Sequence, residues 1–155
     1  MPNYLKLIFS IILCQLAGFI GSFFTRDSIG WYITLTKPSF RPPNWLFGPV
    51  WIALYLLMGI ALYLIWKRGF QSSESRYPVI IFLVQLILNA SWSIVFFGAR
   101  SIGGGLIVIA VLWILIFLTI LSFRKVNKTA SYLLIPYLIW VSFASILNFS
   151  IWRLN

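Results

Sequence analysis

The chain has 155 residues, of which 61% are hydrophobic and 9% are charged, and its mean hydropathy is +0.98. An ordinary soluble domain carries about 25% charged residues, so this composition excludes both a water-soluble globule and a disordered chain. The net charge is +10, with no histidine and one cysteine, Cys14. Five stretches of 19 to 25 residues contain no charged side chain, namely 7–25, 42–66, 77–99, 101–123 and 129–152.

Each uncharged stretch is long enough for one membrane span, because a hydrocarbon core about 30 Å thick takes about 20 helical residues. Lipid cannot satisfy unpaired backbone groups, and the apolar runs are continuous rather than alternating, so helices are favoured over a barrel. We therefore predict an all-α membrane protein, a five-transmembrane-helix bundle that forms a single domain over residues 1–155. The helices are expected near 5–25, 44–66, 77–98, 102–123 and 130–152.

The first predicted helix is favoured as a retained span over a signal peptide. Its apolar run exceeds the roughly 7–15 residues of a signal peptide, and no small-x-small cleavage pattern follows it. The next segment, 26–43, is the longest connection and is rich in proline and aromatic residues. Because prolines stiffen the backbone, this loop is expected to fold over the bundle as a pocket lid or to lie at the membrane interface.

Aromatic and amide side chains recur at helical spacing in three of the predicted helices. Residues three or four positions apart share one helix face, and amides that face lipid are costly, so these stripes should face the bundle interior. Such amides either join helices by hydrogen bonds or anchor a ligand in an apolar cavity, and the spacing leaves both interpretations open. The stripes are Trp51, Tyr55 and Met58; Gln85, Asn89, Trp92 and Phe96; and Tyr137, Trp140, Ala144 and Asn148.

Three helices can thus each turn an indole ring toward a common interior. Indole offers a large flat apolar surface and one N–H donor, which suits a bulky, planar, mostly apolar ligand with a few acceptors. The alternative is a packed aromatic core that binds no ligand.

Conventional acid–base and metal chemistry has few residues available. Asp27 and Glu74 are the only acids and lie outside the predicted spans, which disfavours both a paired-carboxylate mechanism and proton-coupled transport. With no histidine and with Cys14 in mid-span, the usual zinc or haem-iron ligands are missing, and we predict no metal site.

The basic residues sit at the ends of the apolar stretches, where they meet lipid headgroups, so the net charge does not indicate a nucleic-acid partner. With five spans, the amino terminus shares a side with loops 67–76 and 124–128, and that side holds seven Lys and Arg against five on the other. This bias favours a cytoplasmic amino terminus.

Four motifs spread over nearly the whole chain carry a resemblance to a known family. The longest is Trp31-Tyr32-x-x-Leu35-x-Lys37-Pro38-x-Phe40-x-Pro42-Pro43-x-Trp45-x-Phe47-x-x-Val50-Trp51. The others are Leu54-Tyr55-x-x-Met58-Gly59, Gln85-x-x-x-Asn89-x-x-Trp92-Ser93, and Pro136-Tyr137-x-x-Trp140-Val141-x-Phe143-Ala144-x-x-Leu147-Asn148. They strongly resemble the translocator protein family, also called the peripheral benzodiazepine receptor or tryptophan-rich sensory protein (TspO/MBR) family. The short chain without a targeting extension looks like a bacterial member, which would lie in the bacterial cell membrane.

The resemblance implies a five-helix bundle whose first loop closes a pocket for porphyrins, including protoporphyrin IX, and for drug-like isoquinoline carboxamides or benzodiazepines. Family members are also linked to light- and oxygen-dependent porphyrin breakdown, so a porphyrin would be ligand or substrate, and no other cofactor is implied. Trp51 and Trp140 are the candidates for any photochemistry, and the helical stripes add Tyr55 and Gln85 to the expected site. The positions that match the family's pocket are Tyr32, Pro42, Trp51, Asn89, Trp92, Tyr137, Trp140 and Ala144.

Several functional alternatives stay open at this point. A ligand carboxylate could meet Lys37 or Arg41 in the first loop, and the bundle could instead transport tetrapyrroles or other small lipophilic molecules. The absence of an intramembrane charge and of an internal repeat argues against active transport. The resemblance implies a homodimer as a possible state, although the third span lacks a clean small-xxx-small pattern. It gives no basis for sterol binding, because Phe149 stands where the family's sterol motif has tyrosine.

Overall fold

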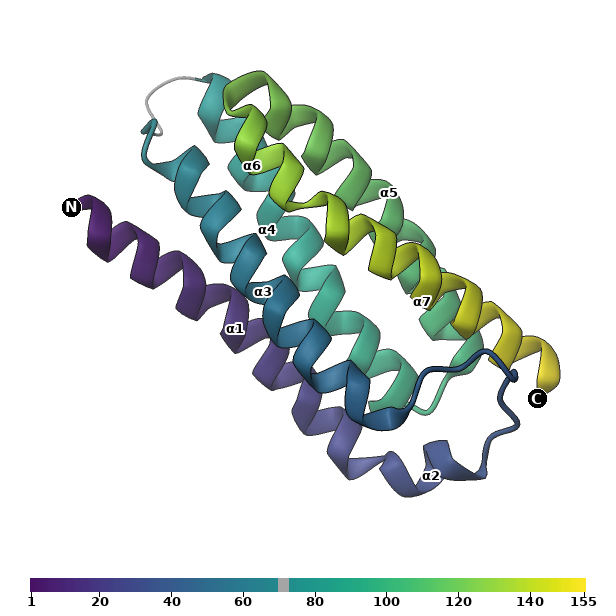
Figure 1. The fold of residues 1–155 in the computed structure, drawn as a ribbon. Coiled ribbons are helices and arrows are strands. Elements are labelled where there is room, and N and C mark those ends of the chain that lie inside the picture. Colours follow the sequence, from purple (N-terminus) through teal and green to yellow (C-terminus); the bar gives the residue numbers. More distant parts are fainter. Residues whose placement is uncertain (70–72) are drawn as a thin grey trace.

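The computed structural model describes residues 1–69 and 73–155, and it confirms the predicted all-α membrane bundle. Among these residues, five helices are long and apolar enough to cross a membrane, and they run alongside one another (Figure 1). The elements are α1 (Asn3–Asp27), α2 (Ile29–Thr34), α3 (Asn44–Trp66), α4 (Ser73–Ser93), the π-helix η1 (Ile94–Gly98), α5 (Ile102–Val126), α6 (Lys128–Leu133) and α7 (Ile135–Leu154).

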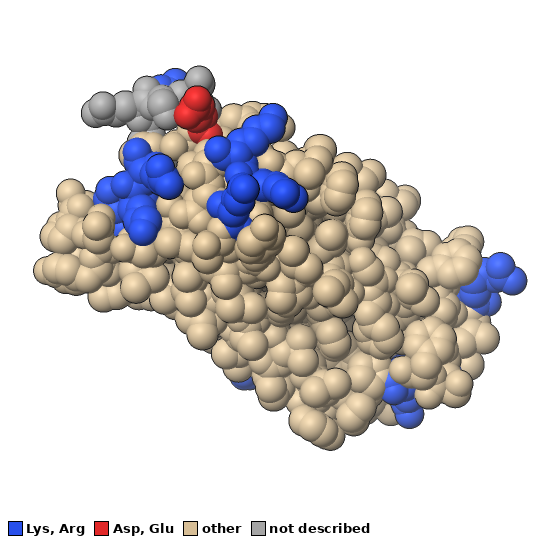
Figure 2. All heavy atoms as spheres, turned by 45° about the horizontal axis from the view of Figure 1, so that its top comes forward, with Lys and Arg blue, Asp and Glu red and all other residues tan. Residues whose placement is uncertain are grey.

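Charge is arranged as a membrane protein requires. Figure 2 shows most of the Lys and Arg side chains on one face gathered at one end of the molecule, with a wide uncharged surface beyond them. Large apolar side chains such as Phe19, Ile87 and Ile107 are more than 60% exposed on the outside of the bundle. In water this surface would be unfavourable, whereas in a bilayer it faces acyl chains.

The last predicted span consists of two helical pieces. The side chain of Asn127 accepts a hydrogen bond from the Ala130 backbone N–H at 3.0 Å and so caps the start of α6. The helix is interrupted at Leu134, where Pro136 in the first turn of α7 has no N–H to continue the hydrogen-bond ladder. Together α6 and α7 form one span, 128–154.

A π-helix ends the third span at the level of the first loop. Over Ile94–Gly98 the wider turn places two adjacent aromatic side chains, Phe96 and Phe97, in the interior, where both are buried. The Ser28 hydroxyl donates to the Phe97 carbonyl oxygen at 2.6 Å, which ties the junction between α1 and α2 to this turn. Such wide turns are frequent at functional sites, and this one contributes to the cavity described below.

The bundle is packed unevenly along its length. Toward the end where α3 finishes and α4 begins, the interior is filled by apolar side chains, among them Ile65, Phe82, Ile116 and Phe123, all fully buried. The Phe82 and Phe123 rings stack there with centroids 5.7 Å apart. The other half of the bundle, near the first loop, is where the structure leaves space.

Candidate functional site

A cavity of about 670 Å³ lies in the half of the bundle near the first loop. This volume falls within the range of about 300–1,000 Å³ that is typical of small-molecule sites. The largest part of its wall is apolar or aromatic. The helix α1 contributes Gln15, Gly18, Phe19, Gly21, Ser22, Thr25 and Arg26; α2 and α3 contribute Ile29, Tyr32, Asn44, Phe47, Gly48, Trp51, Ile52 and Tyr55; α4, η1 and α5 contribute Asn89, Trp92, Ser93, Phe96, Phe97, Ile109 and Leu112; and α7 contributes Trp140, Val141, Ala144, Leu147, Asn148 and Ile151.

Most residues that the sequence places at a pocket line this cavity. Seven of the ten do so: Tyr32, Trp51, Tyr55, Asn89, Trp92, Trp140 and Ala144. The other three, Pro42, Gln85 and Tyr137, are not part of its wall. Contact of any of the ten with a ligand stays a prediction, but the indoles of α3, α4 and α7 do meet at one hollow.

Aromatic rings in the cavity wall contact one another both by stacking and edge to face. Trp51 stacks on Tyr55 with centroids 5.5 Å apart, and Trp92 stacks on Phe96 at 5.1 Å. The Trp140 ring meets Phe47 edge to face at 5.8 Å. These contacts fix the ring planes, so the wall presents flat apolar surfaces that are already oriented before any ligand arrives.

The floor of the cavity is a chain of buried hydrogen bonds between three helices. The Tyr55 hydroxyl donates to Asn89 Oδ1, and Asn89 Nδ2 donates to the Tyr137 hydroxyl oxygen at 2.8 Å. The Tyr137 hydroxyl in turn donates to Gln85 Oε1 at 2.7 Å, and Gln85 Nε2 lies 4.0 Å from the sulfur of Met58. Gln85 and Tyr137 are each only 1% exposed, so they support the floor from beneath and do not face the cavity. For Gln85 the packing interpretation of the amide stripe is therefore the better one.

The indole N–H groups differ in what they bind. Trp92 Nε1 donates to Asn148 Oδ1 at 3.0 Å, and Asn148 Nδ2 donates to the Ile102 carbonyl oxygen at 3.1 Å. By contrast, Trp140 Nε1 is buried and has no hydrogen-bond partner among the described residues. An unpaired buried donor is unfavourable by about 1–3 kcal/mol, and the Trp140 N–H is such a donor in the helix that carries the cavity wall.

The cavity opens sideways between α1 and α3. The lining residues on this side are exposed, including Phe19 at 66% and Ile52 at 62%. At this side of the cavity, Gln15 Nε2 donates to the Ile52 carbonyl oxygen at 3.1 Å and joins α1 to α3. A Cβ added at Gly48 would meet no atom within 4 Å, which shows how much space lies beside α3 here.

Sequence reasoning missed the contribution of α1. Its polar and small residues Gln15, Gly18, Ser22 and Thr25 all line the cavity, and their spacing of three or four residues places them on one helix face. This pattern could have indicated a fourth wall.

The first loop covers less of the cavity than the lid interpretation suggests. From residues 26–43 only Arg26, Ile29 and Tyr32 line it, and Arg26 belongs to the last turn of α1. Tyr32 packs against Phe97 with ring centroids 5.6 Å apart, and burial raises the pKa of its hydroxyl. The proline-rich part of the loop, including Pro42, does not line the cavity.

Lys37 forms hydrogen bonds within the first loop and does not line the cavity. Its ammonium donates to the carbonyl oxygens of Tyr32 and Leu35, both at 2.9 Å, and lies 4.7 Å from the Tyr32 ring centroid. Desolvation, and secondarily the charge of Arg41, lower the pKa of Lys37. Neither Lys37 nor Arg41 lines the cavity, and contact of either residue with a ligand carboxylate stays a prediction.

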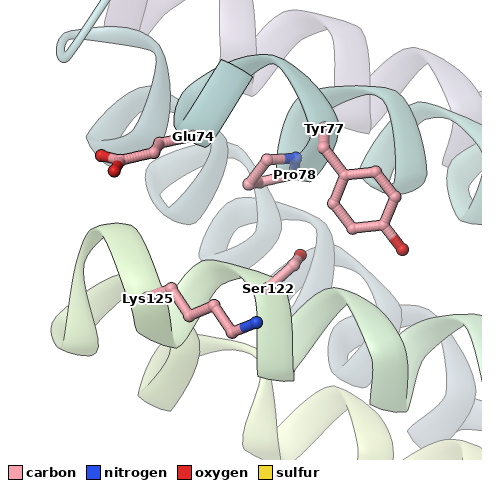
Figure 3. Close-up of a pocket in the computed structure, with 5 residues that line it drawn as sticks. All are labelled: Glu74, Tyr77, Pro78, Ser122 and Lys125. Atoms are coloured by element: carbon pink, nitrogen blue, oxygen red, sulfur yellow. The ribbon is translucent and has the colours of Figure 1, made fainter. Parts of the chain in front are cut away.

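A second, smaller depression of about 230 Å³ lies at the opposite end of the bundle, between the start of α4 and the end of α5 (Figure 3). Glu74, Tyr77 and Pro78 of α4 face Ser122 and Lys125 of α5 across it. It is too small for a bulky aromatic ligand, and two of its lining residues, Glu74 and Lys125, are charged. The larger cavity is therefore the candidate site.

Comparison with known proteins agrees with this architecture. The profile of the TspO/MBR family matches residues 10–153. The tryptophan-rich protein TspO of Chlorobaculum tepidum is 51% identical over 97% of this chain and 96% of its own length. The protein of the same name from Archaeoglobus fulgidus is 50% identical over 99% of both chains, and the translocator protein of Bos taurus is 36% identical over 99% of this chain and 92% of its own. The resemblance seen in the sequence is confirmed, and this chain is a membrane protein of the TspO/MBR family.

Proposed function

We propose that this protein is a membrane receptor that binds porphyrin-like tetrapyrroles and related flat aromatic ligands in the cavity between its helices. The observation that supports this most directly is the meeting of Trp51, Trp92 and Trp140, from three different helices, around one cavity of about 670 Å³. Stacking on an aromatic face adds about 0.5–1.5 kcal/mol per pair to the free energy gained from burying apolar surface. A planar ligand gains from both effects.

Binding rather than passage is favoured by the uneven packing of the bundle. The cavity ends at the hydrogen-bonded floor of Tyr55 and Asn89, and beyond that floor the interior is filled by buried side chains such as Met58 and Phe82. A ligand that enters from the side therefore meets a closed end. This arrangement suits a receptor better than a path across the membrane.

A porphyrin titration followed by the ligand's absorbance tests the proposal on the detergent-solubilised chain. The double variant Trp51→Phe, Trp140→Phe should weaken porphyrin binding about tenfold, because two large rings in the wall become smaller. Trp45→Phe is the matched control, since Trp45 is 72% exposed and does not line the cavity. Unchanged affinity in the double variant would refute the assignment of the cavity as the porphyrin site.

Light-dependent breakdown of the bound porphyrin is a second function that the same wall supports. Trp51 and Trp140 both line the cavity, so a porphyrin held there would lie against two readily oxidised side chains. Light and molecular oxygen would supply the reactive species, and no acid–base pair is needed. Illumination of the complex should then yield a new absorbing product that is lost in the double variant. Equal product from free porphyrin in detergent would end this idea.

The proposed setting is the cell membrane, with the amino terminus in the cytoplasm. Seven Lys and Arg residues belong to the side that carries the amino terminus, against five on the other, and basic loops are retained on the cytoplasmic side. In this orientation the cavity and the first loop lie at the opposite, outer half of the bilayer.

A further inference from the structure

The smaller depression between α4 and α5 combines one acidic and one basic side chain. Figure 3 shows Glu74 on the α4 side and Lys125 on the α5 side, with the Lys125 side chain extending along α5 toward Ser122. Both charged side chains are exposed, and within the described part of the chain neither forms an ion pair. The depression therefore offers a negative and a positive group that do not neutralise each other, which is complementary to a ligand that carries both charges.

The backbone beside Pro78 adds an acceptor to the acidic side of the depression. In an α-helix the carbonyl oxygen of Glu74 would accept from the N–H of the residue four positions later, which here is Pro78 and has no N–H. On the α5 side, the Ser122 hydroxyl donates to the Thr119 carbonyl oxygen at 2.9 Å, so the hydroxyl oxygen itself remains an acceptor. An ammonium group with several N–H donors matches these acceptors better than a quaternary ammonium, which has none.

The depression lies where two membrane spans end, at the depth of the lipid headgroups. The spans are 74–98 and 102–126, and Tyr77 on the rim is 57% exposed, in the position that interfacial tyrosines usually take. Toward the bilayer centre, the same helix faces continue with exposed apolar side chains three or four residues apart, namely Ile80 and Val84 on α4 and Leu121 and Leu118 on α5. A molecule whose polar end sits in the depression can therefore lay apolar chains along these side chains.

We propose that this depression binds the headgroup of a phospholipid that carries a primary ammonium, the phosphatidylethanolamine class. Lys125 Nζ donates to the phosphate, while the Glu74 carboxylate and its unpaired carbonyl oxygen accept from the ammonium. Charge-assisted hydrogen bonds of this kind are stronger than neutral ones. The site lies at the opposite end of the bundle from the central cavity, so it does not depend on the proposed porphyrin binding.

The surrounding charge attracts phosphate but cannot select the ammonium. Basic residues attract the phosphate of any phospholipid to this end of the molecule. Selectivity for the ammonium therefore depends on Glu74, the acid that lines the depression. The other basic residues near the depression in the sequence are Lys67, Arg68, Arg76, Arg124 and Lys128.

The test measures lipid binding to the full chain in neutral detergent by native mass spectrometry. The lipids have identical acyl chains and form the series from phosphatidylethanolamine through its N-methylated forms to phosphatidylcholine, which loses N–H donors one at a time. Phosphatidylethanolamine should bind roughly threefold to tenfold more tightly than phosphatidylcholine, because the contacts are charge-assisted but partly screened by solvent. Glu74→Gln should abolish this ranking. Lys125→Gln should weaken binding of every lipid in the series, since all carry the phosphate.

The chain offers a matched control for each variant. Asp27→Asn removes an exposed acid at the other end of α1, and it should keep the ranking of the lipids. Arg124→Gln removes an exposed base next to Lys125 that does not line the depression. Lys125→Gln should therefore weaken lipid binding more than Arg124→Gln does.

Three results would overturn the proposal. The first is equal affinity for phosphatidylethanolamine and phosphatidylcholine in the unmodified chain. The second is a preference that persists in Glu74→Gln, or a stronger preference for phosphatidylglycerol, since either would show general attraction to the basic end. The third is displacement of the lipid by glycerophosphoethanolamine at matched concentration, because this soluble headgroup lacks the acyl chains that should contribute to binding.

Discussion

Two glycines in the cavity wall give a sharp test of the geometry, because both lie in helices yet have different surroundings. A Cβ built at Gly18 of α1 would overlap the Tyr55 ring, lying 2.6 Å from Cδ2 and 3.2 Å from Cζ. A Cβ built at Gly48 of α3 would meet nothing within 4 Å. The variants Gly18→Ala and Gly48→Ala therefore make the same chemical change with and without a clash against a neighbouring helix.

The expected free energies have opposite signs. Replacing a helical glycine by alanine stabilises by up to about 1 kcal/mol, because the unfolded chain loses backbone freedom. At Gly18 this gain is set against about 1–3 kcal/mol of overpacking, since the Tyr55 ring is stacked on Trp51 and its hydroxyl is bound to Asn89. We expect Gly18→Ala to lower the stability by up to about 2 kcal/mol, and Gly48→Ala to leave it equal or slightly higher.

The assay measures thermal unfolding and porphyrin affinity of both variants in the same detergent. Gly18→Ala should lower the unfolding midpoint and weaken porphyrin binding, because displacement of Tyr55 disturbs both the floor and the stacked wall. Gly48→Ala should keep both values close to those of the unmodified chain. If the two variants behave alike, the close contact between α1 and the Tyr55 ring does not exist in the membrane protein, and the reasoning is refuted.

Three further predictions follow from contacts elsewhere in the structure. Tyr137→Phe removes the hydroxyl in the middle of the buried amide chain and should destabilise the protein by about 1–3 kcal/mol, as measured by the unfolding midpoint; no loss would contradict the network. Asn155→Ala removes two hydrogen bonds to the backbone of Thr36, at 2.8 and 3.1 Å, and should therefore speed hydrogen exchange at the Thr36 N–H. An unchanged exchange rate would show that these hydrogen bonds do not protect the Thr36 N–H. In intact cells, an impermeant maleimide should label a cysteine placed at Ser39 but not one at Lys128, and the reverse pattern would invert the proposed orientation.

The spans were predictable from sequence because each is a continuous uncharged run, and lipid imposes helix on such a run. The aromatic stripes were informative for a related reason: an amide such as Asn89 cannot face acyl chains cheaply, so its whole helix face is turned inward. That is why Trp51, Trp92 and Trp140 could be expected to converge.

The sequence could not reveal how deep each inward-facing residue lies along its helix, where a helix widens, or where the bundle opens, because hydrophobicity does not encode these features. Gln85 and Asn89 share a stripe, yet only Asn89 borders the cavity, because their depth along the helix decides which one lies beneath the floor. The sequence stripe predicts that Phe96 faces inward, but the π-turn that brings its neighbour Phe97 inward as well leaves no mark in an apolar run. The opening between α1 and α3 beside Gly48 also could not be predicted from the sequence, because residues that face lipid and residues that face the bundle are equally apolar.

The sideways mouth has a consequence for how this protein should be studied. A hollow that opens toward hydrocarbon is accessible to lipid tails and to detergent tails, which are always present at high local concentration. Any flat ligand must displace such a tail, so its apparent dissociation constant will rise with the amount and the chain length of the amphiphile used. Dissociation constants measured in micelles or in bilayers therefore include competition with these tails. They can be compared only after extrapolation to zero concentration of detergent or lipid.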